Sequence, residues 1–287
     1  MATTDAVTST PRTRRRPRYL AHAGLMAFGL FMLYPLIWLL SSSFKPTPEI
    51  FTSPGLIPEN FTLENYVAGW TALDSPFSRY LLNSLIVVVG SIIGNLLACS
   101  LAAYAFARLN FKFKRFWFAV MLGTIMLPIH VVIVPQYILF AQLDWINTYW
   151  PLIVPKLLAT DAFFIFLMVQ FIRGLPKELD EAARIDGCGH FGIFWRVIMP
   201  LSLPALATTA IFTFIWTWND FFSQLIFLTG PDMYTVPVAL RTFVDATSQT
   251  PWGPVFAMSI VSLGPIFGFF LAGQRYLVRG IATSGIK

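Results

Sequence analysis

The sequence predicts an all-α polytopic membrane protein with six transmembrane helices. Of its 287 residues, 56% are hydrophobic and 12% are charged, whereas a soluble domain typically has about 25% charged residues. A single soluble globule could not cover that much apolar surface, so a soluble enzyme and a disordered tail are both excluded. Two cysteines, Cys99 and Cys188, are too few and too far apart for a disulfide framework or a zinc site.

Five long stretches contain no Asp, Glu, Lys or Arg, and crossing about 30 Å of hydrocarbon takes about 20 apolar residues. A sixth candidate, residues 150–172, contains Lys156 and Asp161 in its first half, but its second half, AFFIFLMVQFI, is apolar. Lys156 can extend its amine to the membrane interface. The five charge-free stretches are bounded by Arg18 and Lys45, Arg79 and Arg108, Arg115 and Asp144, Arg196 and Asp220, and Asp245 and Arg275.

The distribution of basic residues predicts the orientation. Sixteen of the twenty Lys and Arg residues lie in the N-terminal tail, at 108–115, at 173–200 and in the C-terminal tail. By the positive-inside rule both termini are cytoplasmic, and we interpret the RTRRRPR stretch as a topology anchor rather than a nucleic-acid site. The predicted regions are a cytoplasmic basic tail at 1–19, a first transmembrane helix at 20–43, an extracytoplasmic loop at 44–80, a core domain with five transmembrane helices at 81–277 and a cytoplasmic tail at 278–287.

Small residues and prolines predict a packed bundle. Gly90, Gly94, Ala98 and Ala102 recur every four residues in the second span, which lets another helix approach closely in lipid. The third span carries Pro128 and Pro135, and a membrane tolerates broken helical hydrogen bonds only where protein or water replaces them. We therefore expect the third span to be kinked and buried.

The fifth span has a polar face. On a continuous helix Thr209, Thr213, Thr217, Asp220 and Gln224 would fall within an arc of about 80°, and intramembrane ionisable residues are functional candidates by default. The alternatives are that the threonines bond their own helix, that Asp220 sits at the outer interface, and that the tryptophans form an interfacial belt rather than a sugar-stacking site. The candidate substrate-pathway residues are Thr213, Trp216, Thr217, Asn219, Asp220 and Gln224.

Residues 173–200 form a loop of zero net charge, with four basic and four acidic side chains. KELDEAARID is typical of a short helix, which Gly187 can end in a left-handed conformation. A second amphipathic helix, HFGIFWRVI, then leads to Pro200. Two short helices joined at a glycine favour a docking element, although an ordinary interfacial loop would have the same pattern.

The same loop carries a recognisable motif. Glu181-Ala182-Ala183, then Gly187 after three residues, then Val197 to Pro200 after nine more, resembles the EAA loop of binding-protein-dependent ABC importer permeases. Val197 and Met199 depart from the motif conservatively, standing for Ile and Leu. The stretches SSSFKPTPEIF, AAYAFARLNFKFKR and WNDFFSQLIFL and the ending GQRYLVRGIATSGIK resemble the maltose-type carbohydrate permeases.

The resemblance implies a type I ABC importer permease fold in a bacterial or archaeal cytoplasmic (inner) membrane, with 81–277 as the core permease domain. It also implies a heterodimer with a second permease subunit, two cytoplasmic ATPase subunits and an extracytoplasmic solute-binding protein, and no nucleic acid. Closure of the ATPases on ATP would then move the loop and switch the permease between its two states. The implied ATPase-coupling residues are Glu181, Ala182, Ala183, Asp186, Gly187, His190, Phe191, Phe194 and Pro200.

The chain has no GxxxxGK[ST] loop to hold a phosphate, so we expect it to bind no cofactor, with ATP and Mg²⁺ on the partner ATPases. GCGHFG at 187–192 fits GxGxxG but joins two helices, outside the βαβ unit that a dinucleotide site needs. His22, His130 and His190 lie in three unrelated places, so neither a metal site nor a catalytic centre is predicted, and the chain is expected to be a transport subunit rather than an enzyme.

Two questions stay open on the sequence. An ion-driven secondary transporter would need several intramembrane ionisable groups and usually internal repeats, whereas only Asp220 lies deep in a span and no clear repeat is present. The expected cargo is a sugar, and glycerophospho-compounds, polyols and amino sugars would also fit a pathway of hydroxyls, aromatic rings and one carboxylate.

Overall fold

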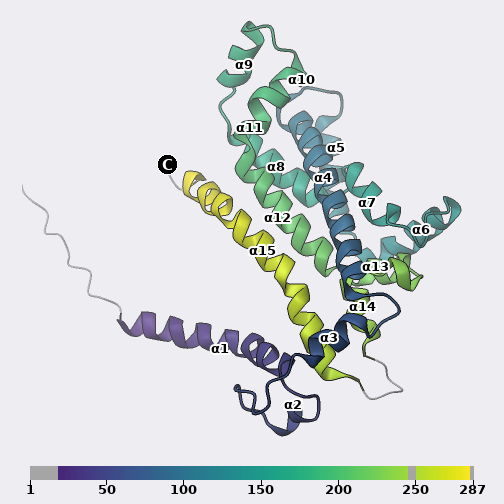
Figure 1. The fold of residues 1–287 in the computed structure, drawn as a ribbon. Coiled ribbons are helices and arrows are strands. Elements are labelled where there is room, and N and C mark those ends of the chain that lie inside the picture. Colours follow the sequence, from purple (N-terminus) through teal and green to yellow (C-terminus); the bar gives the residue numbers. More distant parts are fainter. Residues whose placement is uncertain (1–18, 245–249, 285–287) are drawn as a thin grey trace, which may run out of the picture.

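The computed structural model describes residues 19–244 and 250–284. In that part of the chain every regular element is a helix, as the sequence predicts (Figure 1). The basic tail 1–18 lies outside the described residues, as do the last three residues of the chain. The helices are α1 (Tyr19–Ser43), α2 (Glu49–Thr52), α3 (Glu64–Thr71), α4 (Phe77–Arg108), α5 (Lys114–Thr124), α6 (Ile129–Gln142), α7 (Trp150–Leu157), α8 (Ala162–Gly174), α9 (Glu178–Ile185), α10 (His190–Ile193), the π-helix η1 (Phe194–Ile198), α11 (Met199–Leu201), α12 (Leu203–Asn219), α13 (Phe222–Phe227), the 3₁₀ helix η2 (Pro231–Met233), α14 (Val236–Thr242) and α15 (Trp252–Ser284).

Within the described residues, four helical stretches are long and apolar enough to cross a membrane, and up to six are if each of two bent pairs counts as one span. The four are His22–Ser43, Phe77–Arg108, Trp150–Gly174 and Trp252–Arg275. The bent pairs are Lys114–Thr124 with Ile129–Gln142, at 100°, and His190–Leu201 with Leu203–Asn219, at 76°. The predicted third and fifth spans are therefore broken rather than continuous.

Helix α4 is the central element, and α7, α8 and α12 pack against it. The approach of α7 occurs at the predicted small residues. A Cβ atom on Gly90 would lie 2.8 Å from Ile153 Cδ1, and one on Gly94 would lie 3.0 Å from backbone atoms of Lys156 and Leu157. The small-residue pattern is confirmed at these two positions, because no larger side chain would fit between the helices.

The third span was expected to be kinked and buried, and only the first expectation is confirmed. The chain breaks before Pro128, which adopts an extended conformation with ψ 137°. Helix α5 has no buried residue, and only Ile133 and Phe140 are buried in α6. Within this chain both helices therefore leave most of their surface uncovered, and burial of the third span against other protein stays a prediction.

The fourth span also contains a break, between Leu157 and Ala162. Ala159 has φ 56°, a left-handed conformation that side chains other than glycine rarely adopt. The ammonium of Lys156 lies 2.9 Å from Asp161 Oδ2 across the break. Its extension to the membrane interface stays a prediction.

The polar face predicted for the fifth span assumed a helix that continues to Gln224, and that assumption was wrong. Helix α12 ends at Asn219, Asp220 is extended with ψ 108°, and Gln224 lies on the separate helix α13. Asp220 Oδ1 accepts a hydrogen bond from Ser223 N at 3.1 Å. The carboxylate therefore caps the start of the next short helix instead of continuing a stripe.

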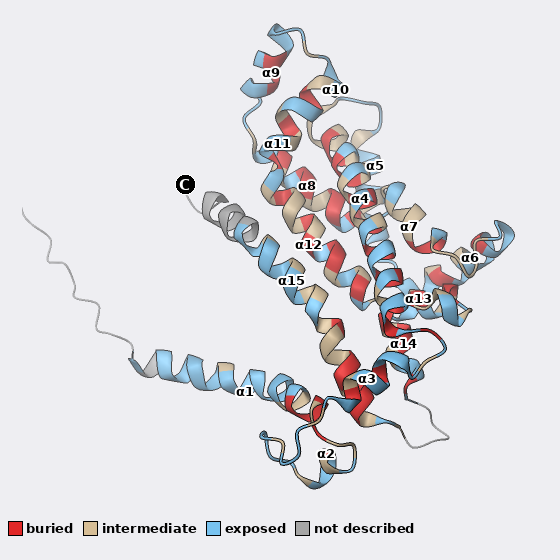
Figure 2. Cartoon of the chain, in the orientation of Figure 1, coloured by how far each residue is buried: buried red, intermediate tan, exposed pale blue. Residues whose placement is uncertain are grey.

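Helix α1 lies apart from the bundle and is exposed along most of its length, as Figure 2 shows. Helices α2 and α3 follow it at the end of the molecule where α15 begins, while α9 and α10 lie at the opposite end (Figure 1). Within residues 44–80, Lys45 is fully buried and donates to Ser53 O at 2.8 Å and Gly55 O at 2.5 Å. Asn65 of α3 donates to Lys45 O at 2.7 Å. This segment is thus a folded cap rather than an open loop.

Candidate functional site

Residues 173–200, here called the hairpin, contain the two predicted short helices. The first, α9, has Glu178, Asp180 and Glu181 in its first turn, where carboxylates interact favourably with the helix dipole. Gly187 ends it with φ 82°. Gly187 N donates to Arg184 O at 3.0 Å and Cys188 N to Ala183 O at 2.9 Å, the two hydrogen bonds of a Schellman motif. The left-handed conformation predicted for this glycine is confirmed.

The residues assigned to ATPase coupling divide into an outer and an inner set. Ala183 and Phe194 are the inner set, at 8% and 1% exposed. Phe191, by contrast, is 70% exposed, and Ile185 on the first helix is 87% exposed. The exposed members of the predicted set are Glu181, Ala182, Asp186, Gly187, His190, Phe191 and Pro200.

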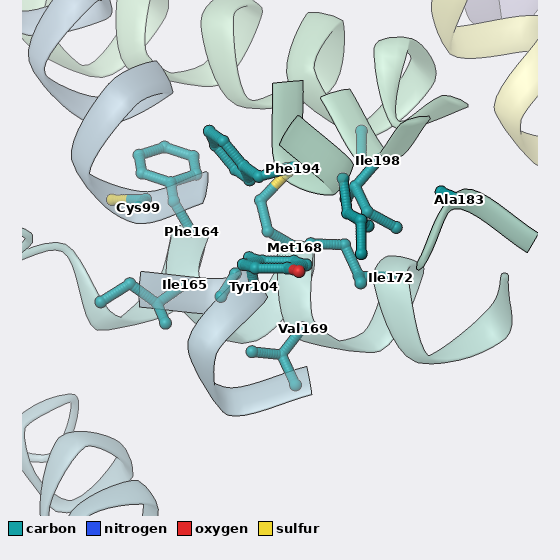
Figure 3. Packing of buried hydrophobic residues seen from close by; sticks show 13 residues of the cluster. Cys99, Tyr104, Phe164, Ile165, Met168, Val169, Ile172, Ala183, Phe194 and Ile198 are labelled. Carbon is teal, nitrogen blue, oxygen red and sulfur yellow. The ribbon is translucent and has the colours of Figure 1, made fainter. Parts of the chain in front are cut away.

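The inner set attaches the hairpin to the bundle. Phe194 packs on Tyr104 of α4, with ring centroids 5.4 Å apart. Met168 and Ile172 of α8 and Ile198 of η1 belong to the same buried cluster, which Figure 3 shows closing around Phe194. Burying a side chain of this size contributes about 1.5–3 kcal/mol. A displacement of the hairpin would therefore pull on α4 and α8.

A buried ion pair, which the sequence analysis did not identify, makes a second attachment. Arg108 Nε, at the end of α4, lies 3.1 Å from Asp180 Oδ2 on α9, and the two side chains are 3% and 9% exposed. Arg108 Nη2 also donates to Leu175 O at 2.8 Å. The only signal in the sequence is an arginine at the end of an apolar span and an aspartate before the EAA triplet, which does not specify a pairing.

The hairpin continues into α12 through irregular helix. Its second arm passes from α10 through the π-helix η1 to α11, and the bend of 76° to α12 follows at Ser202, next to Pro200. Neither the π-helix nor the size of this bend was predicted. The arm carries both the exposed Phe191 and the buried Phe194, three residues apart.

A pocket of 620 Å³ lies between helices α5, α6, α7, α8, α12 and α13. Trp216 and Asp220 line this pocket, and Trp216 is 49% exposed. Thr213 and Gln224 do not line it, and each is 2% exposed or less. Ligand pockets typically enclose about 300–1,000 Å³, so the cavity is large enough for one or two sugar units.

Thr213 and Gln224 instead take part in helix packing. Thr213 Oγ1 accepts a hydrogen bond from Asn95 Nδ2 at 3.1 Å. Gln224 Nε2 donates to Thr217 O at 2.9 Å, and Gln224 Oε1 accepts from Thr235 Oγ1. Asn219 is exposed, and its amide donates to Ile215 O of its own helix at 2.7 Å. The structure thus brings two of the six pathway candidates to one pocket, and the roles of all six stay predictions.

The pocket also contains a charged pair that was not singled out as a site. Lys156 and Asp161 both line it, and Asn95 Nδ2 donates to Asp161 Oδ2 at 2.7 Å. The available signal was the presence of two charges in the first half of the fourth span, which only weakened the assignment of that span. No group of three or more His, Cys, Asp or Glu side chains suited to a metal ion occurs in the described ranges.

Residues 90–283 match the family model of the binding-protein-dependent transport system inner membrane component. The chain is 37% identical to the probable ABC transporter permease protein YurM of Bacillus subtilis, over 95% of this chain and 91% of that protein. It is 34% identical to the trehalose/maltose transport system permease protein MalG of Thermococcus litoralis, over 94% and 97%, and 32% identical to the diacetylchitobiose uptake system permease protein NgcG of Streptomyces coelicolor, over 95% and 90%.

The fold resembles a chain from the crystal structure of a bacterial ABC transporter involved in the import of the acidic polysaccharide alginate, with a TM-score of 0.79 and 21% identity over 93% of this chain and 99% of that one. A likeness at this identity shows an ABC transporter permease fold. The family match covers more than half of the chain, and relatives above 30% identity cover nearly all of it. The chain belongs to the binding-protein-dependent transport system inner membrane components, and it is a permease subunit rather than an enzyme.

Proposed function

We propose that this chain is the transmembrane permease subunit of an ATP-driven importer that takes up sugars delivered by an extracytoplasmic solute-binding protein. Relatives named for trehalose/maltose, diacetylchitobiose and arabinooligosaccharide transport support a sugar as cargo. The half-exposed Trp216 in the pocket also supports it, because an aromatic face can stack on a sugar ring. Polyols, amino sugars and glycerophospho-compounds are the alternative cargoes.

The chain would work as a heterodimer with a second permease subunit, two cytoplasmic ATPase subunits and the binding protein, in the inner membrane of a bacterium or archaeon. Both of its termini and the hairpin would face the cytoplasm. The chain itself would bind no cofactor, with ATP and Mg²⁺ held by the ATPase subunits. Its likeness to a chain from an alginate transporter solved with a periplasmic protein, at a TM-score of 0.66, fits this assembly.

One observation carries the proposal: the hairpin is exposed on one side and tied into the bundle on the other. Its exposed residues include Glu181, Ile185 and Phe191. Inward, it is attached through Phe194 and the Arg108–Asp180 ion pair. When the ATPase subunits close on ATP, a surface of this kind would transmit their movement to α4, α8 and α12 and switch the permease between inward- and outward-facing states.

The test replaces Glu181 with alanine in the complex of permease, ATPase and binding protein. Loss of a hydrogen bond to a charged group costs about 1.5–3 kcal/mol, so ATPase binding should weaken roughly tenfold or more, since 1.4 kcal/mol is a factor of ten. Uptake driven by ATP should fall at least as much. Membrane insertion, measured by the amount of chain in washed membranes, should not change.

The matched control is Glu178→Ala, an exposed glutamate one turn earlier on the same helix. It changes the charge of α9 equally but lies outside the EAA triplet, so uptake should stay near the wild-type level. Normal ATP-coupled uptake in the Glu181→Ala variant would contradict the proposed coupling role. Identifying the compound retained by the co-purified binding protein would decide between a sugar and the alternative cargoes.

A further inference from the structure

The fourth span is interrupted where it lines the pocket. A charged side chain lies near each end of the interruption. Helix α7 ends at Leu157 and α8 begins at Ala162. Irregular backbone inside a membrane is tolerated only where it is buried in protein or lines a water-filled cavity, and intramembrane charges are a functional-site hypothesis by default. Both rules apply to this break. Lys156 and Asp161 are charged residues of the span, and both line the pocket of 620 Å³.

The pair is held in place but not fully enclosed. Lys156 Nζ lies 3.0 Å from Asp161 Oδ1 and 2.9 Å from Oδ2. Asn95, which is 1% exposed, donates to Oδ2 from α4 at 2.7 Å. The side chains of Lys156 and Asp161 are nevertheless 30% and 23% exposed. A pair that only locked two helices together would be expected to lie fully inside the protein.

The hydrogen-bonding capacity of the pair is not used up by the contacts among the described residues. An ammonium has three N–H donors and a carboxylate about four lone-pair sites. Lys156 Nζ lies within hydrogen-bonding distance of both carboxylate oxygens of Asp161, which also accepts from Asn95. At least one N–H of the ammonium and one lone-pair site of the carboxylate are therefore left for a further partner, which matches two adjacent hydroxyl groups: one oxygen accepts from the ammonium, and the other hydroxyl donates to the carboxylate.

The other residues that line the pocket restrict the chemical class of ligand that it can bind. Trp216 packs beside Phe163, with ring centroids 5.2 Å apart, and both line the pocket. An exposed aromatic face suits the C–H face of a sugar ring and offers less to a flexible open-chain polyol. Asp220 adds a second carboxylate, so the wall has two carboxylates against one ammonium, which disfavours anionic cargo.

We propose that Lys156 and Asp161, positioned by Asn95, form a subsite that binds adjacent hydroxyl groups of a neutral sugar unit stacked on Trp216. This proposal rests on the proposed function and specifies where the cargo contacts this chain. Asn95 is a positioning residue, because its amide reaches the cargo only through Asp161.

The experiment uses the complete complex in proteoliposomes with its binding protein. The probes are the labelled neutral disaccharides maltose, trehalose and cellobiose, together with the disaccharide of galacturonate. ATPase stimulation by the liganded binding protein reports the proposed function, and sugar imported per ATP hydrolysed reports the subsite. Asp161→Asn and Lys156→Met should each lower import per ATP at least tenfold for the neutral probe that the wild type carries, with ATPase stimulation within about twofold of the wild type.

Asp232→Asn is the matched control, because it breaks the exposed pair of Arg79 and Asp232 outside the pocket and should leave import per ATP unchanged. Wild-type import per ATP in both pocket variants would overturn the subsite. Import of the galacturonate probe in preference to every neutral probe would also overturn it. A wild-type complex without stimulated ATPase or uptake would instead contradict the proposed function.

A second measurement decides the question if the charge variants do not assemble. Thr160 is exposed and lines the pocket next to Asp161. In a Cys99→Ala, Cys188→Ala background, a Thr160→Cys chain should react with a hydrophilic methanethiosulfonate reagent, and the transported sugar should slow that reaction at least fivefold. An unchanged rate in the presence of saturating sugar would exclude occupancy of this site.

Discussion

At the scale of single residues, Gly187 connects the sequence most directly to the structure. The motif requires a glycine at this position, and the structure shows why: φ is 82° and the residue closes a Schellman motif. The neighbouring Gly189 has no such requirement, because its φ is −73°. The two glycines are therefore a natural pair for testing backbone conformation separately from side-chain volume.

We expect Gly187→Ala to impair coupling and Gly189→Ala to leave it intact. A left-handed conformation costs a residue with a Cβ about 1–2 kcal/mol, while neither position has any atom within 4 Å of an added Cβ. The first variant should lose roughly fivefold or more of its ATP-driven uptake, measured per assembled complex. Equal uptake by the two variants would mean that the turn does not need this conformation.

The polar residues show the limit of reading a helix face from spacing. Thr209, Thr213 and Thr217 do share one helix, but Gln224 belongs to another, because α12 ends at Asn219. An aspartate can continue a helix or cap the next one, and the choice depends on where the chain must turn. Asp220 caps the next helix, because its carboxylate accepts a hydrogen bond from Ser223 N.

At the scale of elements, the contact between α4 and α7 was predictable. A repeat of small residues every four positions in an apolar helix favours the close approach of a second helix. The structure identifies the partner helix as α7, with the least adaptable contact at Gly94, where a Cβ would lie 3.0 Å from backbone atoms. Backbone atoms cannot rotate aside as the end of a flexible side chain can.

Gly94→Val should therefore separate α4 from α7 and lower the melting temperature of the purified complex. Overpacking of a core costs about 1–3 kcal/mol. Gly268→Val, in α15, makes the same chemical change where no atom lies within 4 Å of the added Cβ, and it should leave the melting temperature near that of the wild type. A complex in which both variants melt like the wild type would argue against tight packing at Gly94.

The attachment of α9 to α4 through Arg108 and Asp180 was not predictable from the sequence. We expect Asp180→Asn to destabilise this attachment, because removing one partner of a buried ion pair costs about 3–5 kcal/mol. Asp232→Asn breaks an exposed pair with Arg79, whose side chains are 51% and 70% exposed, and such pairs contribute about 0–1 kcal/mol.

Protease resistance of the hairpin and ATP-driven uptake are the measurements for this pair. Asp180→Asn should lower both, and Asp232→Asn should lower neither. Reversing the pair, with Arg108→Asp and Asp180→Arg together, should recover part of the lost protection. Unchanged protease resistance in the Asp180→Asn chain would show that the ion pair does not anchor α9.

At the scale of the whole molecule, the hairpin and the cap at residues 44–80 lie at opposite ends of the bundle (Figure 1). The positive-inside rule predicts that the hairpin end faces the cytoplasm. The arginines of the N-terminal tail on which that rule depends most lie outside the described residues, so labelling is the direct test of orientation.

In a chain without Cys99 and Cys188, a cysteine at position 182 should react with a membrane-impermeant maleimide only after the cells are permeabilised. A cysteine at position 57 should react in intact cells. Both native residues are exposed, Ala182 on α9 and Ile57 at 84% in the cap. Labelling of Ala182→Cys in intact cells would reverse the orientation and remove the basis for contact with cytoplasmic ATPases.

The sequence by itself determined the all-helical fold class, the stretches long and apolar enough to cross a membrane and the place of the hairpin along the chain. These properties follow from local features that a membrane enforces strictly: the length of apolar runs, the bias of basic residues between loops, and a glycine at a fixed distance from the EAA triplet. Each can be evaluated over a few dozen neighbouring residues. For the same reason Pro128 indicated a break in the third span, although not its angle of 100°.

Only the tertiary structure decided which residues meet. Arg108 and Asp180 are 72 positions apart, and Asn95 and Asp161 are 66 apart. A local sequence pattern does not predict which partner a buried charged group pairs with, because the pairing depends on how helices that are distant in the sequence pack against each other. The same dependence on tertiary structure paired Lys156 with Asp161 at the wall of the pocket, where the carboxylate lies 2.9 Å from the ammonium and both side chains stay partly exposed.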